Sequence, residues 1–158
     1  MSIYIFSRPI HSGKTTELLQ WCNRQKNIHG ILMPDINGSR KFLNLDKKEI
    51  FDAECVDITN TNLSITSIGK FNFYMDAFEK ANSILMRALN RNPDWLVIDE
   101  VGKLELGGKG FYTSVAEAIK TYADKNKKGD LLLTVRDSLC EEVIVFLNIK
   151  NYKIISSL

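Results

Sequence analysis

The most constraining feature of this sequence is the tetrapeptide Gly-Lys-Thr-Thr at residues 13–16, between an apolar run and a segment with helical periodicity. Residues 3–6 are apolar, whereas residues 15–26 place their apolar side chains on one helical face. A strand that enters a glycine-containing turn and then a helix aims backbone N–H groups and the positive helix end at one point. The pattern predicts a phosphate-binding loop.

Each side chain of this loop has an expected role. Lys14 would reach the β- and γ-phosphates of a nucleotide, and Thr15 would offer its hydroxyl to Mg²⁺. The residues expected to wrap the nucleotide phosphates are Arg8, Pro9, Ile10, His11, Ser12, Gly13, Lys14, Thr15 and Thr16. The alternative is that Gly13 and Lys14 merely start a helix, and the preceding strand argues against it.

Position 8 departs from the full pattern, which has glycine five residues before Gly13, because this chain has Arg8 there. If that position needed a positive φ, an arginine would cost about 1–2 kcal/mol. Arg8 then either points outward or contacts a phosphate as an added cation, or the loop binds weakly. We expect phosphate binding to be retained.

The middle of the chain, residues 30–75, has the pattern of short strands separated by polar turns. Residues 30–33 and 42–45 are apolar runs, and the Asn37-Gly38 pair between them is favoured in tight hairpins. A β-hairpin insertion is therefore expected here.

The remaining segments alternate between helical and strand patterns. Residues 76–90 form the clearest helix, with Asp76 as the expected cap and Glu79 completing a capping box. Further strands are expected at residues 95–98, 131–135 and 152–155, and further helices at residues 111–122 and 137–147. This alternation predicts an α/β fold of three layers, a mostly parallel sheet with helices on both faces.

An acidic pair, Asp99 and Glu100, follows the apolar run at residues 95–98. Because open α/β sheets bind ligands at the carboxyl ends of their strands, Asp99 is expected to hold Mg²⁺ through a water. Glu100 is expected to accept a proton from the water that attacks the γ-phosphate. A solvated turn is the alternative, but Lys14 and Thr15 favour the catalytic interpretation.

Composition excludes several other classes. The 158 residues suit one domain, spanning residues 1–158, and the formal charge of +2 gives no sign of nucleic-acid binding. The three cysteines are in no Cys-x-x-Cys pair, so reduced structural thiols are expected. No apolar run could span a bilayer and no signal peptide is evident, so we expect a cytoplasmic protein without a membrane partner.

The sequence Asp-Glu-Val-Gly-Lys-Leu-Glu-Leu at residues 99–106 resembles the signature of the small P-loop nucleoside-triphosphatase family, of the cancer-related and thermophilic type. Weaker similarities at residues 69–70, 78–79 and 134–137 extend the resemblance over most of the chain. It implies a P-loop NTPase fold, Mg²⁺ as cofactor and slow hydrolysis of ATP, GTP or related triphosphates to the diphosphate. The glycine-rich loop of the family is interrupted here by Arg8, Ile10 and His11.

Three further residues belong to the matching motifs. Arg136 follows a predicted strand, where such folds place a cation against the γ-phosphate, and an exposed strand-end arginine is the alternative. For Lys103 and Glu105 we derive no chemical role beyond a salt bridge within the loop.

Two alternative functions remain open. Residues 9–19 are similar to the phosphate-binding loop of zinc-containing thymidine kinases, although the four zinc-binding cysteines are missing. In a kinase, Glu100 would deprotonate a small hydroxylated acceptor instead of water. A nucleotide-sensing module with little turnover is the other alternative. The aromatic residues Phe71, Phe73 and Tyr74 could stack on a base, although alternating aromatics usually belong to a core. Base preference and oligomeric state are not predicted, and a monomer is compatible with the sequence.

Overall fold

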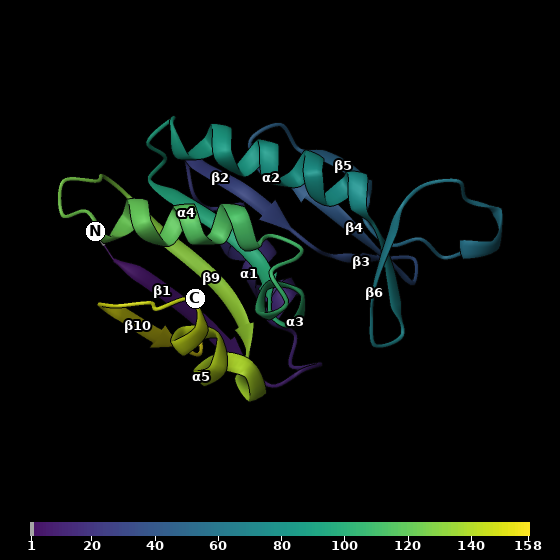
Figure 1. The fold of residues 1–158 in the computed structure, drawn as a ribbon. Coiled ribbons are helices and arrows are strands. Elements are labelled where there is room, and N and C mark those ends of the chain that lie inside the picture. The colour runs from purple at the N-terminus through teal and green to yellow at the C-terminus, as the bar shows by residue number, and fades with distance from the viewer. Residues whose placement is uncertain (1) are drawn as a thin grey trace.

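The computed structural model describes residues 2–158 and has a central, mostly parallel sheet of eight strands (Figure 1). The parallel strands are β1 (Ile3–Arg8), β2 (Ile28–Leu32), β8 (Trp95–Val101), β9 (Asp130–Arg136) and β10 (Tyr152–Ile155). The antiparallel additions are β3 (Asp35–Ile36), β4 (Ser39–Asn44) and β5 (Glu49–Asp52).

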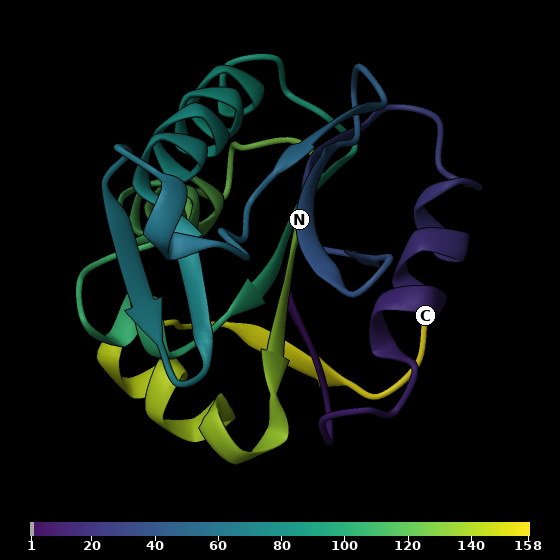
Figure 2. The same cartoon turned by 90° about the vertical axis from the view of Figure 1, so that its right-hand side faces the viewer.

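The helices form the two outer layers, as Figure 2 shows from the side. One face of the sheet packs against α2 (Met75–Leu89), α4 (Tyr112–Ala123) and α5 (Asp137–Phe146), and the other packs against α1 (Lys14–Cys22). Two short helical segments, η1 (Ile58–Asn60) and α3 (Lys103–Leu106), lie in connecting loops. The three-layer α/β fold predicted from the sequence is confirmed.

Alternation along β8 shows why its residues form a central strand. Leu96 and Ile98 belong to the core on the α2 and α4 side, whereas Val97 belongs to the core on the α1 side. All three side chains are fully buried, as expected for a parallel strand covered on both faces.

The order of strands in the sheet is β10-β1-β9-β8-β2-β4-β3, with β5 paired to β4. Strand β9 therefore lies between β1, which leads into the phosphate-binding loop, and β8, which carries the acidic pair, although it follows both in the sequence. Because these three strands run parallel, their carboxyl ends meet at one edge of the sheet. The fold thereby places three distant segments side by side.

The β-rich middle of the chain forms the predicted insertion. Asn37 and Gly38 have φ values of 55° and 80° in the turn between β3 and β4, which confirms the hairpin. A second hairpin, of β6 (Ile65–Ile68) and β7 (Phe71–Tyr74), forms a separate two-stranded sheet. It joins the main body through backbone hydrogen bonds, among them Cys55 N to Asn72 O at 2.7 Å.

Two local predictions were wrong. Helix α2 begins at Met75, so Asp76 lies within its first turn, and the Tyr74 cap position makes no side-chain hydrogen bond. The predicted capping box is absent because β7 leads directly into the helix at Tyr74. Helix α1 ends at Cys22, four residues earlier than the periodicity suggested.

Cys22, Cys55 and Cys140 are all buried and free of disulfides. Burial raises the pKa of the Cys22 thiol to about 12, so it is protonated at neutral pH. Among residues 2–158, no helix combines the length and apolar character that crossing a membrane requires.

Candidate functional site

The phosphate-binding loop connects β1 to α1 as the sequence predicted. Gly13 precedes the helix in a left-handed conformation, with φ of 76°, which glycine adopts without steric cost. The loop residues 9–16 line a cavity of about 340 Å³ at the carboxyl edge of the sheet. The N-terminus of α1 therefore borders an open space in which an anion can bind.

Arg8 is the last residue of β1 and does not have a positive φ, so it carries no such backbone cost. The positive φ values of this loop are those of His11, at 59°, and Gly13, at 76°. The Arg8 guanidinium lies 2.8 Å from a carboxylate oxygen of Glu17 and 5.0 Å from the centre of the Phe6 ring. Arg8 is not among the described residues that line the cavity.

Asp99 is fully buried and is held by neutral hydrogen-bond donors. One carboxylate oxygen accepts from the backbone N–H of Met33 at 3.0 Å. The other accepts from the backbone N–H of Glu100 at 3.0 Å and from the Thr134 hydroxyl. Burial, and then the charge of Glu100, raises the pKa of Asp99, while the charge of Lys14 acts in the opposite direction.

Glu100 has an unusual backbone conformation, with φ of 60°. The pairing of β8 with β9 shifts register between Ile98 and Val101, so Glu100 lies at a bulge. Its backbone N–H also donates to the Thr134 hydroxyl at 2.8 Å. Non-glycine residues with positive φ cost about 1–3 kcal/mol and are concentrated at functional sites. Here the bulge coincides with a Glu100 side chain that lines the cavity.

The structure brings most of the predicted site residues together. Lys14, Thr15, Glu100 and Arg136 all line the same cavity, although they come from three different segments of the chain. Lys14 is only 7% exposed, whereas Asp99 lies behind the cavity wall. The predicted anion-binding loop, the Glu100 carboxylate and the Arg136 cation therefore border the same space.

Sequence reasoning missed two residues of this site. Thr134 links Asp99 to the backbone of Glu100, and its only signal was its place in the Thr-Val-Arg-Asp similarity at residues 134–137. Arg40, in the hairpin insertion, lines the cavity opposite the loop and donates to the backbone oxygen of Met33 at 3.3 Å. No sequence pattern marks Arg40, because its position depends on how β4 packs.

A second cavity, of about 300 Å³, adjoins the first. The two share Glu100 and Arg136 in their walls. The walls of the second cavity combine apolar and charged residues. The apolar ones include Ile68, Phe71, Phe73, Phe78, Leu104 and Leu139, and the charged ones that it does not share are Lys70, Lys103 and Glu105. Of the alternating aromatics, Phe73 belongs to the core, and Phe71 and Tyr74 pack against it.

Glu105 supports the loop that follows the acidic pair. Its buried carboxylate accepts from the backbone N–H of Gly102 at 2.8 Å and from that of Phe111 at 2.7 Å. A Cβ at Gly110 would lie 2.4 Å from this carboxylate, so only glycine fits there. Burial raises the pKa of Glu105 to about 7. These backbone contacts replace the loop salt bridge suggested by the sequence.

The side chains around the cavity show which residues could hold the predicted Mg²⁺. Within residues 2–158 there is no group of three His, Cys, Asp or Glu side chains placed to hold a metal. Mg²⁺ that is bound with a nucleotide takes most ligands from phosphates and water and one or two from the protein. The Thr15 hydroxyl on the cavity wall and the Asp99 carboxylate behind it fit such an ion.

Comparisons with known proteins agree with this geometry. A family model described as NTPase matches residues 3–154. The nucleoside-triphosphatase THEP1 of Methanopyrus kandleri is 26% identical over 110 residues, which cover 67% of this chain and 61% of that protein. The match thus spans less than two thirds of the relative's length.

Two solved structures share the fold. The crystal structure of THEP1 from the hyperthermophile Aquifex aeolicus has a TM-score of 0.70 and 22% identity, over 98% of this chain and 88% of the other. The solution structure of a human cancer-related nucleoside triphosphatase has a TM-score of 0.64 and 20% identity, over 97% and 86%. At these identities the likeness shows the fold alone.

Proposed function

The chain belongs to the NTPase family, and on that premise we propose that it hydrolyses the γ-phosphate bond of a magnesium-bound nucleoside triphosphate in the cavity lined by residues 9–16. The observation that carries the proposal is the convergence of Lys14, Glu100 and Arg136 on this one cavity. A cation at an anion-binding loop and a carboxylate beside it are the groups that phosphoryl transfer to water requires.

Binding follows from the loop and helix α1. The backbone N–H groups of the loop and the positive end of α1 would hold the β- and γ-phosphates, and the Lys14 ammonium would neutralise part of their charge. Thr15 and Asp99 would hold the Mg²⁺, which when bound neutralises the developing phosphate charge. These parts position the triphosphate with its γ end toward Glu100.

Proton transfer is assigned to Glu100. Its carboxylate accepts a proton from the attacking water, while the bulge and the Thr134 hydroxyl fix the backbone that carries it. The water oxygen forms a bond to the γ-phosphorus as the bond to the β-phosphate oxygen breaks, which releases the diphosphate. Arg136 stabilises the negative charge that spreads over the transferring group.

The experiment is phosphate release from ATP, GTP, CTP and UTP, with and without Mg²⁺. Glu100→Gln is expected to lower kcat by about 10²–10⁴-fold with little change in nucleotide affinity, because it removes only the proton acceptor. Lys14→Ala is expected to weaken nucleotide binding as well. The exposed Glu141→Gln on α5 is the matched control.

Unchanged release by Glu100→Gln would contradict the proposal. Tight binding of the magnesium nucleotide by calorimetry, with negligible release by the unmodified protein over hours, would favour the sensing module instead.

A further inference from the structure

The second cavity, of about 300 Å³, meets the phosphate cavity at a shared wall. Among the described residues, that wall consists of Ile10, His11, Arg40, Glu100 and Arg136. Lys70 and Lys103 line the second cavity and not the first. The second cavity therefore has basic residues of its own besides the two that it shares.

Basic side chains outnumber acidic ones in the walls of this cavity. Among the described residues that line it, the basic ones are Arg40, Lys70, Lys103 and Arg136, and the acidic ones are Glu100 and Glu105. The Glu105 carboxylate already accepts hydrogen bonds from two backbone N–H groups, those of Gly102 and Phe111. Because burial raises the pKa of Glu105 to about 7, this side chain is also partly protonated at neutral pH. The cavity is therefore cationic.

The four cations of the cavity have no carboxylate partner in the protein. Within residues 2–158, none of them forms an ion pair. Basic residues outside the cavity are different, since Lys41 pairs with Asp52 in the same insertion and Lys80 of α2 pairs with Glu49. The charge of the cavity cations must then be balanced by ions from solution or by a ligand.

An aromatic ring holds two of these cations in place. The Lys70 ammonium lies 5.3 Å from the centre of the Phe71 ring, and the Arg40 guanidinium lies 5.7 Å from it. Arg40 also donates to the backbone oxygen of Met33 at 3.3 Å. A neutral ring and a carbonyl oxygen restrict the two side chains but do not cancel their charge. Both cations also have further N–H donors, which an anion can use.

Charge and size indicate the class of ligand. A phosphate group on a small molecule carries a charge of about −1.5 to −2 at pH 7 and three strong acceptor oxygens, which suits several converging lysines and arginines. A volume of about 300 Å³ is at the lower end of the range for small-molecule sites. Ile68, Leu104 and Leu139 in the walls can pack against a small organic group that the phosphate carries.

We propose that the second cavity binds the phosphate group of a second small molecule, with Lys70 and Lys103 as its own ligands and Arg40 and Arg136 shared with the nucleotide site. The molecule is either free phosphate or a phosphate monoester with a small organic group, since both present the same oxygens. Its place beside the γ-phosphate rests on the proposed function, whereas its binding does not.

The test is calorimetry on the full chain saturated with magnesium AMP-PNP, a nonhydrolysable analogue of ATP that fills the γ-phosphate position. The probes are orthophosphate and butyl phosphate, with butanol as the uncharged control. We expect butyl phosphate to bind at least about tenfold more tightly than butanol. A similar Kd for orthophosphate would identify free phosphate as the ligand, whereas a Kd about tenfold weaker would identify a monoester.

A pair of double variants assigns the binding to the cavity. The Lys70→Gln, Lys103→Gln protein should bind butyl phosphate about tenfold more weakly or worse, because it loses two charge-assisted contacts. The matched control is Lys125→Gln, Lys150→Gln, which removes the same charge from two exposed lysines outside both cavities and should change this Kd less than about twofold. The Kd of AMP-PNP should change less than about threefold in either protein.

The outcomes separate this inference from the proposed function. If neither anion binds, or if the Lys70→Gln, Lys103→Gln protein binds butyl phosphate as tightly as the unmodified protein, the second site is overturned and hydrolysis stands. Tenfold weaker binding of AMP-PNP by that variant would show that the cavity holds part of the nucleotide, which also overturns the inference. If AMP-PNP does not bind at all, the proposed function fails, and the same titration of nucleotide-free Lys14→Ala protein still tests the second site.

Discussion

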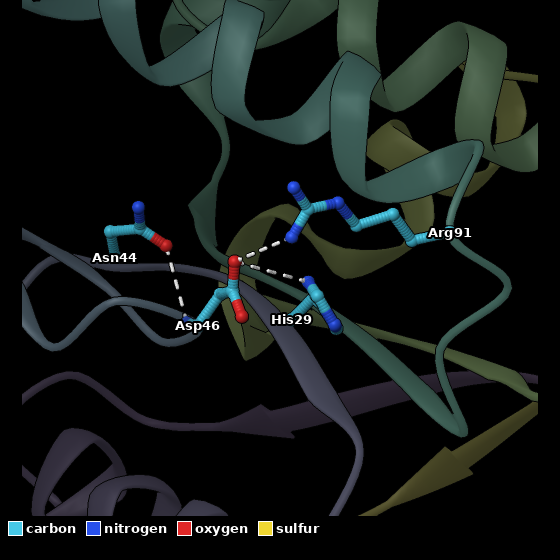
Figure 3. A network of polar contacts seen from close by, with 4 residues as sticks. All are labelled: His29, Asn44, Asp46 and Arg91. Carbon is cyan, nitrogen blue, oxygen red and sulfur yellow. Dashed lines mark hydrogen bonds and ion pairs between the residues drawn. The ribbon is translucent and has the colours of Figure 1, made fainter.

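Two aspartates at opposite edges of the sheet are held by different kinds of partner. Asp46 follows β4 at the amino edge of the parallel strands, where Figure 3 shows one of its carboxylate oxygens facing both Arg91 and His29. Its carboxylate lies 3.0 Å from the Arg91 guanidinium and 3.9 Å from the His29 ring. Its backbone N–H donates to the side-chain oxygen of Asn44 at 3.2 Å.

Asp99 lies at the carboxyl edge and has no such cation in contact. Within residues 2–158 its three hydrogen-bond donors are neutral: the N–H groups of Met33 and Glu100 and the hydroxyl of Thr134. Asp46 is thus paired with cations of the protein, whereas Asp99 is held by neutral donors. The nearby cavity differs accordingly, about 40 Å³ at Asp46 and about 340 Å³ beside Asp99.

The largest predicted effect concerns Glu105, whose carboxylate, like that of Asp99, is buried among neutral hydrogen-bond donors. Its pKa rises from an ordinary 4.5 to about 7, so the folded protein holds more protons than the unfolded chain between these pH values. Stability therefore falls as pH rises through this window, by about 3 kcal/mol at most. In Glu105→Gln this loss should vanish, as measured by urea unfolding at pH 5 and pH 7.5.

The exposed Glu142→Gln is the control for that series, and it should follow the pH dependence of the unmodified protein. A Glu105→Gln protein with the same pH dependence as the unmodified protein would mean that the Glu105 carboxylate is not destabilised by its burial.

Asp99→Asn tests whether the unmatched charge serves a metal. An amide keeps most of the shape but removes the charge behind Thr15, so the Mg²⁺ concentration for half-maximal turnover should rise about 10–100-fold. The measurement is phosphate release as a function of Mg²⁺ at fixed ATP. An unchanged Mg²⁺ requirement would mean that the Asp99 carboxylate, like that of Asp46, has a purely structural role.

Asp46→Asn should have a smaller effect and one confined to stability. The ion pair with Arg91 is partly exposed, and such pairs contribute about 0–1 kcal/mol to the free energy of unfolding. Thermal unfolding measures the loss, and raised salt should diminish it in the unmodified protein. A tenfold change in the turnover of Asp46→Asn would mean that the amino edge of the sheet also contributes to activity.

Arg8→Gln is expected to have the smallest effect on function. The Arg8 cation is already paired with Glu17, as Arg91 is with Asp46, and Arg8 is not among the described residues that line the phosphate cavity. Nucleotide Kd should change less than twofold by calorimetry. A tenfold weaker Kd would mean that Arg8 leaves Glu17 to contact a phosphate when the nucleotide binds.

Local patterns predicted much of this molecule. The loop at residues 13–16 and the apolar run before Asp99 were recognisable because strand, turn and helix preferences act over a few neighbouring residues. The capping box at Asp76 failed for the same reason, since a local rule could not foresee that β7 leads straight into α2. The sequence left open whether Arg8 points outward or contacts a phosphate, because its partner Glu17 becomes a neighbour only once α1 has formed.

The sequence alone determined the alternating elements, the phosphate-binding loop and the acidic pair, because each is encoded by contiguous residues. Only the tertiary structure decided that β9 enters the sheet between β1 and β8, which places Thr134 on Asp99 and Arg136 beside Lys14. It also decided that the second hairpin contributes Ile68 and Phe71 to a cavity that adjoins the phosphate cavity. Strand order and hairpin docking depend on packing between distant segments, which no local pattern of residues encodes.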